Sequence, residues 1–143
     1  MGQINRTALV MHTAEQMFEL VNDVEGYSAF LPWCQSAEII SSSDDLLEAR
    51  LHLHKGALSY SFATRNHLER PHKMTLSLME GPFSDLQGCW EFIPLSEEAC
   101  KVNFSMSYSF ANKLASLAMG KVFNQVASTM VDAFVKRADE VYT

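Results

Sequence analysis

The feature that most constrains this chain is a long stretch in which apolar and polar residues alternate, followed by a segment with a different period. From residue 36 to residue 110 the alternation is almost continuous, and a period of two is typical of strands that bury one face. Strands of a parallel sheet are covered on both faces, so one polar face per strand predicts an antiparallel sheet. The apolar positions are Leu47, Ala49, Leu51 and Leu53, then Leu58, Tyr60 and Phe62, then Met74, Leu76 and Leu78, then Leu86, Trp90 and Phe92, and finally Val102, Phe104, Met106, Tyr108 and Phe110.

The segment from residue 111 to residue 142 changes period and predicts one long helix. Its apolar residues recur at every fourth position and are Leu114, Ala118, Val122, Val126, Met130, Phe134 and Ala138, with Leu117, Phe123 and Val141 beside them. Asn112 precedes them as a suitable N-cap. Gly120 costs a helix interior about 1 kcal/mol relative to alanine, so we expect a close approach or a kink there.

The residues before the alternating stretch predict one strand and two short helices. Residues 3–10 alternate as a strand does. Thr13 and Gln16 match the pattern of a capping box, which predicts that a helix begins there. A second short helix is expected in residues 24–31, because Pro32 would end it.

Together these elements predict an α+β fold in a single domain that spans residues 1–143. A sheet of about six or seven strands with one apolar face must bury that face, and the C-terminal helix is the element long enough to cover it. We therefore expect a curved antiparallel β-sheet wrapped around the long C-terminal α-helix, with two short helices after the first strand. A straight helix does not fill all the space inside a curved sheet, so a short hollow lined by aromatic side chains is expected between them.

Charge and composition exclude several classes of protein. The net charge is -6, so the chain has no broad basic field for phosphate groups, and DNA is not an expected partner. The three cysteines form no C-x-x-C pair and are expected to be buried, reduced thiols of a cytoplasmic protein. No stretch approaches the roughly 18 consecutive apolar residues that a membrane span needs.

Several segments resemble the START-like coenzyme Q-binding family, which includes bacterial proteins labelled oligoketide cyclase or lipid transport protein and the ribosome association toxins. They are "NDVEGYSAFLPWC" at 22–34, "FATRN" at 62–66, "GPFSDLQGCWEFIPL" at 81–95, and "CKVNFSMSYSF" at 100–110 leading into "MGKVFNQVASTMVDAFVKRADEVY" at 119–142. The resemblance covers essentially the whole chain; many relatives have proline where this chain has Ser28. It implies a helix-grip fold whose cavity binds a hydrophobic molecule such as ubiquinone, usually without chemistry.

From this resemblance we expect a non-enzymatic protein that holds ubiquinone or a similar isoprenoid lipid as its ligand, needs no other cofactor, and supports respiratory electron transport. It would be cytoplasmic and peripheral at the inner membrane, with transient membrane contact. The resemblance also implies an alternative, a toxin-like protein that binds the large ribosomal subunit and blocks subunit joining. The last helix offers Lys113, Lys121, Lys136 and Arg137 for that role, although a solvated helix face is the more ordinary explanation for them. A polyketide cyclase or aromatase is a third alternative.

The ligand-binding prediction starts from a glycine beside the largest aromatic residue of a strand. Leu86, Gly88, Trp90 and Phe92 share one side, and a glycine inside a strand often marks a bend or the close approach of a ligand. The aromatic row is therefore either ordinary core or a cavity wall. The predicted ligand-binding set is Phe30, Trp33, Tyr60, Phe62, Thr64, Asn66, Leu78, Gly88, Trp90, Phe92, Phe104, Met106, Tyr108, Val122, Val126 and Met130.

Two polar residues continue the inward side of the strand that carries Tyr60 and Phe62. Thr64 and Asn66 would point into the interior, where buried amides and hydroxyls need partners. A ligand oxygen is one partner, and backbone groups at the strand end are the alternative. Arg65 has the opposite phase and is expected to face solvent.

The stretch "GYSAFLPWC" places apolar side chains where the chain passes from helix to strand. Tyr27, Phe30, Leu31 and Trp33 fit a mobile lid, a patch that touches a membrane, or a hydrophobic plug.

Catalysis has little support in the sequence. His52 and His54 lie two apart on a polar strand face, but no third ligand of metal type is spaced to join them, so no metal site is expected. The cyclase alternative needs an acid or base inside the cavity. By phase, the inward ionisable groups are Arg6, Glu80 and the tyrosines.

Overall fold

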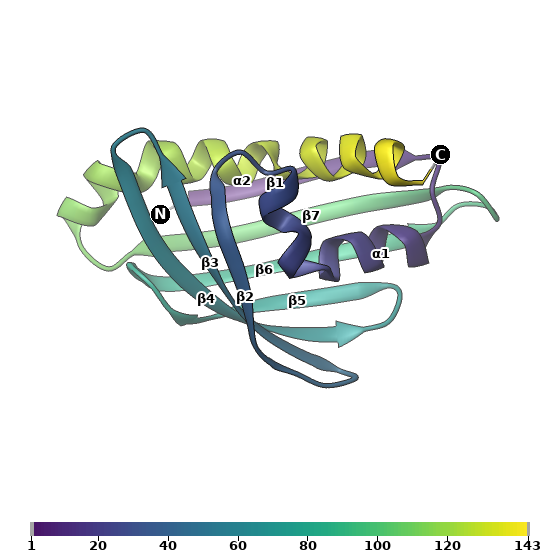
Figure 1. Cartoon of the computed structure of the whole chain (residues 1–143), viewed down its shortest axis with the longest axis horizontal. Coiled ribbons are helices and arrows are strands. Elements are labelled where there is room, and N and C mark those ends of the chain that lie inside the picture. The colour runs from purple at the N-terminus through teal and green to yellow at the C-terminus, as the bar shows by residue number, and fades with distance from the viewer. Residues whose placement is uncertain (1, 143) are drawn as a thin grey trace.

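The computed structural model describes residues 2–142 as a seven-stranded antiparallel sheet that packs against a long C-terminal helix (Figure 1). The elements are β1 (Gly2–Val10), α1 (Ala14–Asn22), the 3-10 helix η1 (Val24–Ala29), β2 (Cys34–Ser42), β3 (Leu46–Lys55), β4 (Leu58–Glu69), β5 (Lys73–Glu80), β6 (Phe83–Pro94), β7 (Cys100–Phe110) and α2 (Lys113–Val141). The strand order is β1-β7-β6-β5-β4-β3-β2, and every neighbouring pair is antiparallel. The predicted α+β fold with a sheet around the last helix is confirmed.

Local signals in the sequence set the helix ends and the main hairpin. Thr13 Oγ1 accepts a hydrogen bond from the Gln16 backbone N–H at 3.1 Å, and Gln16 Oε1 accepts one from the Thr13 N–H at 2.9 Å. Asn112 Oδ1 caps α2 by accepting from the Ala115 N–H at 2.8 Å. Gly56, with φ at +63°, forms the turn between β3 and β4, a backbone conformation that glycine adopts without strain.

Cross-strand register places the apolar positions on one face of the sheet. Leu51 lies opposite Phe62, and Trp90 lies opposite Phe104, all on the inner face that α2 covers. The outer face carries the polar residues that alternate with these apolar positions, among them His52, Ser61, Glu91, Ser105 and Ser107. At the other end of the inner face α1 packs beside α2, and its Phe18 is fully buried against Phe92.

The apolar stripe of α2 is shorter than predicted. Phe123, Val126, Phe134 and Ala138 are buried, and Val122 and Met130 are partly buried. At its two ends, however, Leu114, Leu117, Ala118 and Val141 are exposed. The first two turns of α2 project past the edge of the sheet (Figure 1), so periodicity alone overstated how much of the helix is covered.

The close approach predicted at Gly120 is not found. An added Cβ there would lie 3.8 Å from Phe110 Cε2 and 3.8 Å from Ser116 Oγ, which is ordinary van der Waals contact. The helix runs without interruption from Lys113 to Val141. Nothing in the structure requires glycine at this position.

A β-bulge in β5 corrects the predicted direction of Glu80. Ala63 pairs with Glu80 but Thr64 pairs with Leu78, so Met79 is an extra residue in the ladder. An extra residue shifts the side-chain alternation by one position. The Glu80 carboxylate therefore lies on the outer face, where Arg50 donates hydrogen bonds to it.

Arg6 is also not in the interior. It lies on the helix-facing side of the edge strand β1, but its side chain is exposed, and Nε donates to the Ser128 carbonyl oxygen at 3.2 Å. Within residues 2–142, no helix is both long and apolar enough to cross a membrane.

Candidate functional site

A narrow cavity of about 50 Å³ lies between the inner face of the sheet and α2. It is lined by Val24, Tyr27, Trp33, Ala49, Leu51, Phe62, Thr64, Asn66, Met74, Leu76, Leu86, Trp90, Met106, Phe123, Val126, Ala127 and Met130. Strands β3 to β7 form its floor, α2 forms its roof, and η1 with the residues after it closes one side. The wall is almost entirely apolar.

The polar part of the wall is a pair of neighbours on β4. Thr64 Oγ1 donates a hydrogen bond of 2.9 Å to Asn66 Oδ1, which fixes the orientation of the amide. Asn66 is 5% exposed, and within residues 2–142 its Nδ2 donates no hydrogen bond. Within residues 2–142 the fully buried side-chain atoms without a partner are Asn22 Oδ1 and the Tyr60 hydroxyl oxygen, so Asn66 Nδ2 is not fully buried. Because its oxygen is engaged by Thr64, the amide can donate its N–H groups to an acceptor placed in the cavity.

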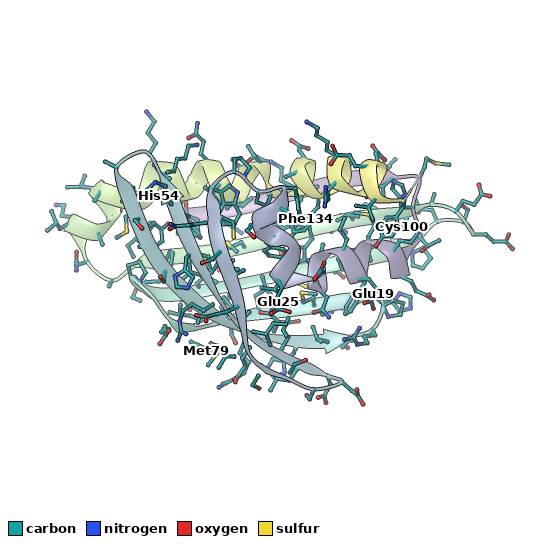
Figure 2. All side chains as sticks on the ribbon, viewed as in Figure 1. Glu19, Glu25, His54, Met79, Cys100 and Phe134 are labelled. Atoms are coloured by element: carbon teal, nitrogen blue, oxygen red, sulfur yellow. The ribbon has the colours of Figure 1, made fainter. Side chains whose placement is uncertain are left out.

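The segment after α1 acts as a plug on one side of the cavity. The Tyr27 hydroxyl donates to the Val21 carbonyl oxygen, and its ring packs edge-on against Phe134 with centroids 5.3 Å apart. Trp33 is 6% exposed and lines both the cavity and a separate surface groove. Phe30 lies outside the cavity, where its ring contacts Phe134 and the Arg137 guanidinium. Figure 2 shows Phe134 near η1, under the C-terminal half of α2.

The structure brings part of the predicted ligand-binding set together around the cavity. Those that line it are Trp33, Phe62, Thr64, Asn66, Trp90, Met106, Val126 and Met130. Those that do not are Phe30, Tyr60, Leu78, Gly88, Phe92, Phe104, Tyr108 and Val122. Whether the first group binds a ligand stays a prediction.

Part of the predicted aromatic row packs as ordinary core and does not line the cavity. Phe92 and Phe104 are ordinary core, 0% and 1% exposed, and both pack against Trp90. Tyr108 packs against Phe123, and its hydroxyl donates to Asn124 Oδ1 at 3.3 Å. The sequence could not separate core from cavity wall, because the two have the same strand phase.

Gly88 does not leave open space in the cavity wall. A Cβ at this position would lie 3.2 Å from Leu76 Cδ1 and 3.3 Å from the Ser105 carbonyl oxygen, with Met106 Cε at 3.6 Å. The side chains of Leu76 and Met106 therefore lean over the glycine, and these two residues form the wall instead. The glycine permits this close packing.

The predicted ligand-binding set leaves out Val24, Tyr27, Ala49, Leu51, Met74, Leu76, Leu86, Phe123 and Ala127, although Tyr27 is predicted to belong to a lid, membrane patch or plug. The strand members of this group have the inward phase that the alternation predicts, so the signal was present. The ligand-binding prediction favoured aromatic residues on the strands, so these aliphatic strand residues were not included. For Phe123 and Ala127, the helical period predicts which face of α2 is buried, but it does not predict which residues of that face border the cavity.

Three methionines make the wall adaptable. Met74, Met106 and Met130 line the cavity from β5, β7 and α2. At about 50 Å³ the cavity is smaller than the roughly 150 Å³ hole that admits benzene in an engineered protein core. Unbranched methionine side chains change rotamer readily, so they are the groups that would move to admit a ring.

The cavity wall offers few ionisable side chains for acid–base chemistry. Among the described residues, its ionisable side chain is Tyr27, whose hydroxyl is already engaged by Val21. Burial raises the pKa of Tyr27, with smaller contributions from Cys34 and Asp23, so it stays protonated near neutral pH. His52 faces outward and bonds Ser61, and residues 2–142 contain no cluster of metal-ligating side chains.

Comparison with known proteins places this chain in a family. Residues 10–135 match the family model described as polyketide cyclase/dehydrase and lipid transport. The chain is 46% identical over 143 residues to the ribosome association toxin RatA of Escherichia coli K12, covering 100% of this chain and 90% of that protein. It is 29% identical over 132 residues to the mitochondrial coenzyme Q-binding protein COQ10 homolog B of Xenopus laevis, covering 90% of this chain and 54% of that protein.

Solved structures share the fold. The Zhui aromatase/cyclase of Streptomyces sp. R1128 superposes with a TM-score of 0.84 at 17% identity, covering 99% of this chain and 96% of that one. The 18 kDa protein CC1736 of Caulobacter crescentus superposes with a TM-score of 0.75 at 26% identity, covering 99% of both chains. With most of its length matched by the family model, the chain belongs to the polyketide cyclase/dehydrase and lipid transport family.

Proposed function

We propose that this protein binds, without converting it, a hydrophobic molecule whose ring carries carbonyl oxygens, such as ubiquinone or a similar isoprenoid lipid. The observation that carries the proposal is the Asn66 amide, a donor without a protein partner on the wall of an otherwise apolar cavity. Ligand sites are commonly apolar with a few placed polar groups that fix orientation. A quinone carbonyl oxygen is an acceptor of the required kind.

The lack of acid–base groups in the cavity supports binding rather than catalysis. Proton transfer at a carbon next to a carbonyl requires a positioned base, and the cavity wall offers the neutral hydroxyl of Tyr27. The similarity to the Streptomyces aromatase/cyclase is at the level of fold, at 17% identity. We therefore propose a carrier that presents a quinone to respiratory enzymes from the cytoplasmic side of the inner membrane.

Trp33 is the proposed gate of the cavity. The surface groove beyond it is lined by Leu31, Pro32, Trp33, His54, Lys55, Gly56, Gln125, Val126, Thr129 and Ala133. Trp33 and Val126 border both spaces, so rotation of the indole would join them. An isoprenoid tail longer than the cavity would leave through this groove.

The test of the proposal is to extract the lipid bound to protein purified from its own host and to titrate lipid-free protein with a short-chain ubiquinone. We expect a quinone in the extract and saturable quenching of tryptophan fluorescence, because Trp90 lines the cavity. A protein that carries no lipid and shows no saturable quenching would overturn the proposal.

As a second candidate, we propose ribosome association through the large subunit. The observation that favours it is the 46% identity over the whole chain to a protein named ribosome association toxin. Lys113, Lys121 and Lys136 are exposed and available, whereas Arg137 pairs with Glu140 at 3.6 Å. Co-sedimentation with purified large subunits at rising salt tests this role, and retention should fall steeply if lysines contact phosphates. Failure to co-sediment at low salt would exclude it.

A further inference from the structure

The first two turns of α2 present large apolar side chains to solvent. Leu114 and Leu117 are 77% and 78% exposed, and Ala118 beside them is exposed as well. These turns extend beyond the sheet edge (Figure 1), so no strand covers them. Two neighbouring leucines exposed on a projecting helix are outside the core, and they become a candidate contact surface only together with the charged residues around them.

Lysines frame this apolar pair. Lys113 and Lys121 lie four residues before and after Leu117, so the three side chains form one row on the helix surface. Lys55, the last residue of β3, donates a hydrogen bond of 3.2 Å to Gln125 Oε1, which places a third lysine beside α2. None of the ion pairs found within residues 2–142 uses these lysines. We call Lys55, Lys113, Leu114, Leu117 and Lys121 the basic–apolar surface.

The basic–apolar surface is positive although the protein is not. No aspartate or glutamate occurs in residues 99–131 or in residues 49–68, which contain all its members. Asp85, the acidic residue on the neighbouring start of β6, lies on the outer face with Gln87. Glu19 and Cys100 lie at the far end of the molecule from His54, which adjoins Lys55 (Figure 2).

Distance separates this surface from most of the negative charge. The first acidic residue of α2 is Asp132, roughly 16 Å beyond Lys121 along the helix axis at 1.5 Å per residue. At physiological ionic strength the Debye length is about 8 Å, so charges farther away are largely screened. The local charge, and not the net charge of -6, governs what this end of the protein contacts.

We infer that the basic–apolar surface docks on a lipid membrane with anionic headgroups. Lysines attract the headgroups, while leucines between them gain free energy by entering the interface, which is the pattern of interfacial amphipathic helices. An RNA surface would attract the lysines through its phosphates, but it would offer no apolar environment in which the leucines gain free energy by burial. Two leucines are also too small an apolar area for the core of a stable protein interface.

The surface groove lies beside the docking surface. Lys55 and Gln125, which are joined by a hydrogen bond, belong to the rim of that groove. A protein docked by the β3–β4 turn and the start of α2 therefore holds the mouth of the groove next to the bilayer. The docking itself does not depend on what the cavity holds, so it is tested with lipid-free protein.

The experiment is vesicle co-sedimentation of the full chain with two kinds of vesicle. One contains phosphatidylglycerol and phosphatidylcholine in equal parts, and the other contains phosphatidylcholine alone. We expect binding to the anionic vesicles that weakens with salt and is much weaker for the neutral ones. Lys55→Gln, Lys113→Gln and Lys121→Gln should each lower the partition coefficient about fivefold. Leu114→Gln with Leu117→Gln should lower it about tenfold.

Matched variants at the opposite end control for exposure and charge. Leu9 and Met11 are 71% and 73% exposed, so Leu9→Gln with Met11→Gln removes a similar apolar area. Lys73→Gln, Lys101→Gln and Lys136→Gln together change the net charge as much as Lys55→Gln, Lys113→Gln and Lys121→Gln combined in one protein. Both control variants should bind vesicles as the wild type does.

Three outcomes would overturn the inference. Equal loss in the control and test variants would show that charge or hydrophobicity anywhere suffices. Equal binding to neutral and anionic vesicles would remove the role of the lysines. Binding to polyuridylate RNA that the lysine variants lose and the leucine variant keeps, without vesicle binding, would identify an RNA surface. Quinone titration of the same variants separates these outcomes from failure of the proposed ligand function.

Discussion

The hydroxyl of Thr64 donates a 2.9 Å hydrogen bond to Oδ1 of Asn66, and both residues line an apolar cavity, so the N–H groups of the Asn66 amide are the ones left to donate there. Two residues of one strand thus create an oriented donor. The threonine determines the direction of the donor, and the asparagine supplies it.

The first prediction concerns this pair. Asn66→Leu should weaken ubiquinone binding about three- to tenfold, the effect of losing one neutral hydrogen bond. Its affinity for an isoprenoid hydrocarbon without carbonyl groups should be unchanged or higher. Thr64→Val should give a smaller loss, since the donor remains but loses its orientation. Isothermal titration of both ligands measures this, and an equal loss for both ligands would show that the amide serves only the fold.

The second prediction concerns the wall between cavity and groove. Trp33→Leu should speed ubiquinone association several-fold, because a smaller side chain leaves the two spaces connected. It should also lower the free energy of unfolding by about 2–4 kcal/mol, as for other truncations of buried aromatic residues. Stopped-flow quenching of Trp90 fluorescence measures the rate.

The control for this experiment is Phe92→Leu. Phe92 is fully buried and lies outside the cavity, so its truncation should destabilise the fold to a similar degree without changing the association rate. If both variants bind faster, general loosening of the fold and not a gate is responsible.

The third prediction contrasts two glycines. Gly88→Ala should destabilise the protein, and Gly88→Leu should do so by about 1–3 kcal/mol, because the new side chain meets Leu76 and the Ser105 carbonyl oxygen. Gly120→Ala should instead raise the free energy of unfolding by up to about 1 kcal/mol, since the helix gains a better helix former with room for its methyl group. Urea denaturation compares them. A stable Gly88→Leu protein would restore the earlier interpretation of an open wall.

The fourth prediction concerns alkaline pH. Burial raises the pKa of the Cys34 thiol from its ordinary 9.0 to about 11. Below pH 9.0 the thiol is protonated in both the folded and unfolded states, so its contribution to stability is fully present there. Between the two values the unfolded state loses its proton first, and stability falls.

Urea unfolding across this pH window measures the effect. Cys34→Ala should show a shallower decline than the wild type, because one titrating group has been removed. Ser36→Ala keeps the Ser36 backbone carbonyl that accepts from the Cys34 thiol, so this variant should decline as the wild type does. Identical slopes in all three proteins would mean that Cys34 titrates alike in the folded and unfolded states.

The sequence by itself determined the strand and helix pattern, because periodicity is a local property of the chain. Alternation gave the antiparallel sheet, the capping residues Thr13 and Asn112 gave the helix starts, and strand phase turned Thr64 and Asn66 inward. These features depend on neighbours within a few residues. They needed no knowledge of the packed molecule.

Tertiary structure alone decided which inward residues border a void and which are packed solid. The bulge at Met79 turned Glu80 outward to Arg50, and Leu76 with Met106 covered Gly88. The end of the sheet left Leu114 and Leu117 in solvent although their spacing continues the apolar stripe. Each of these outcomes depends on where residues distant in sequence come to lie, and a one-dimensional period carries no information about volume or about where a covering layer stops.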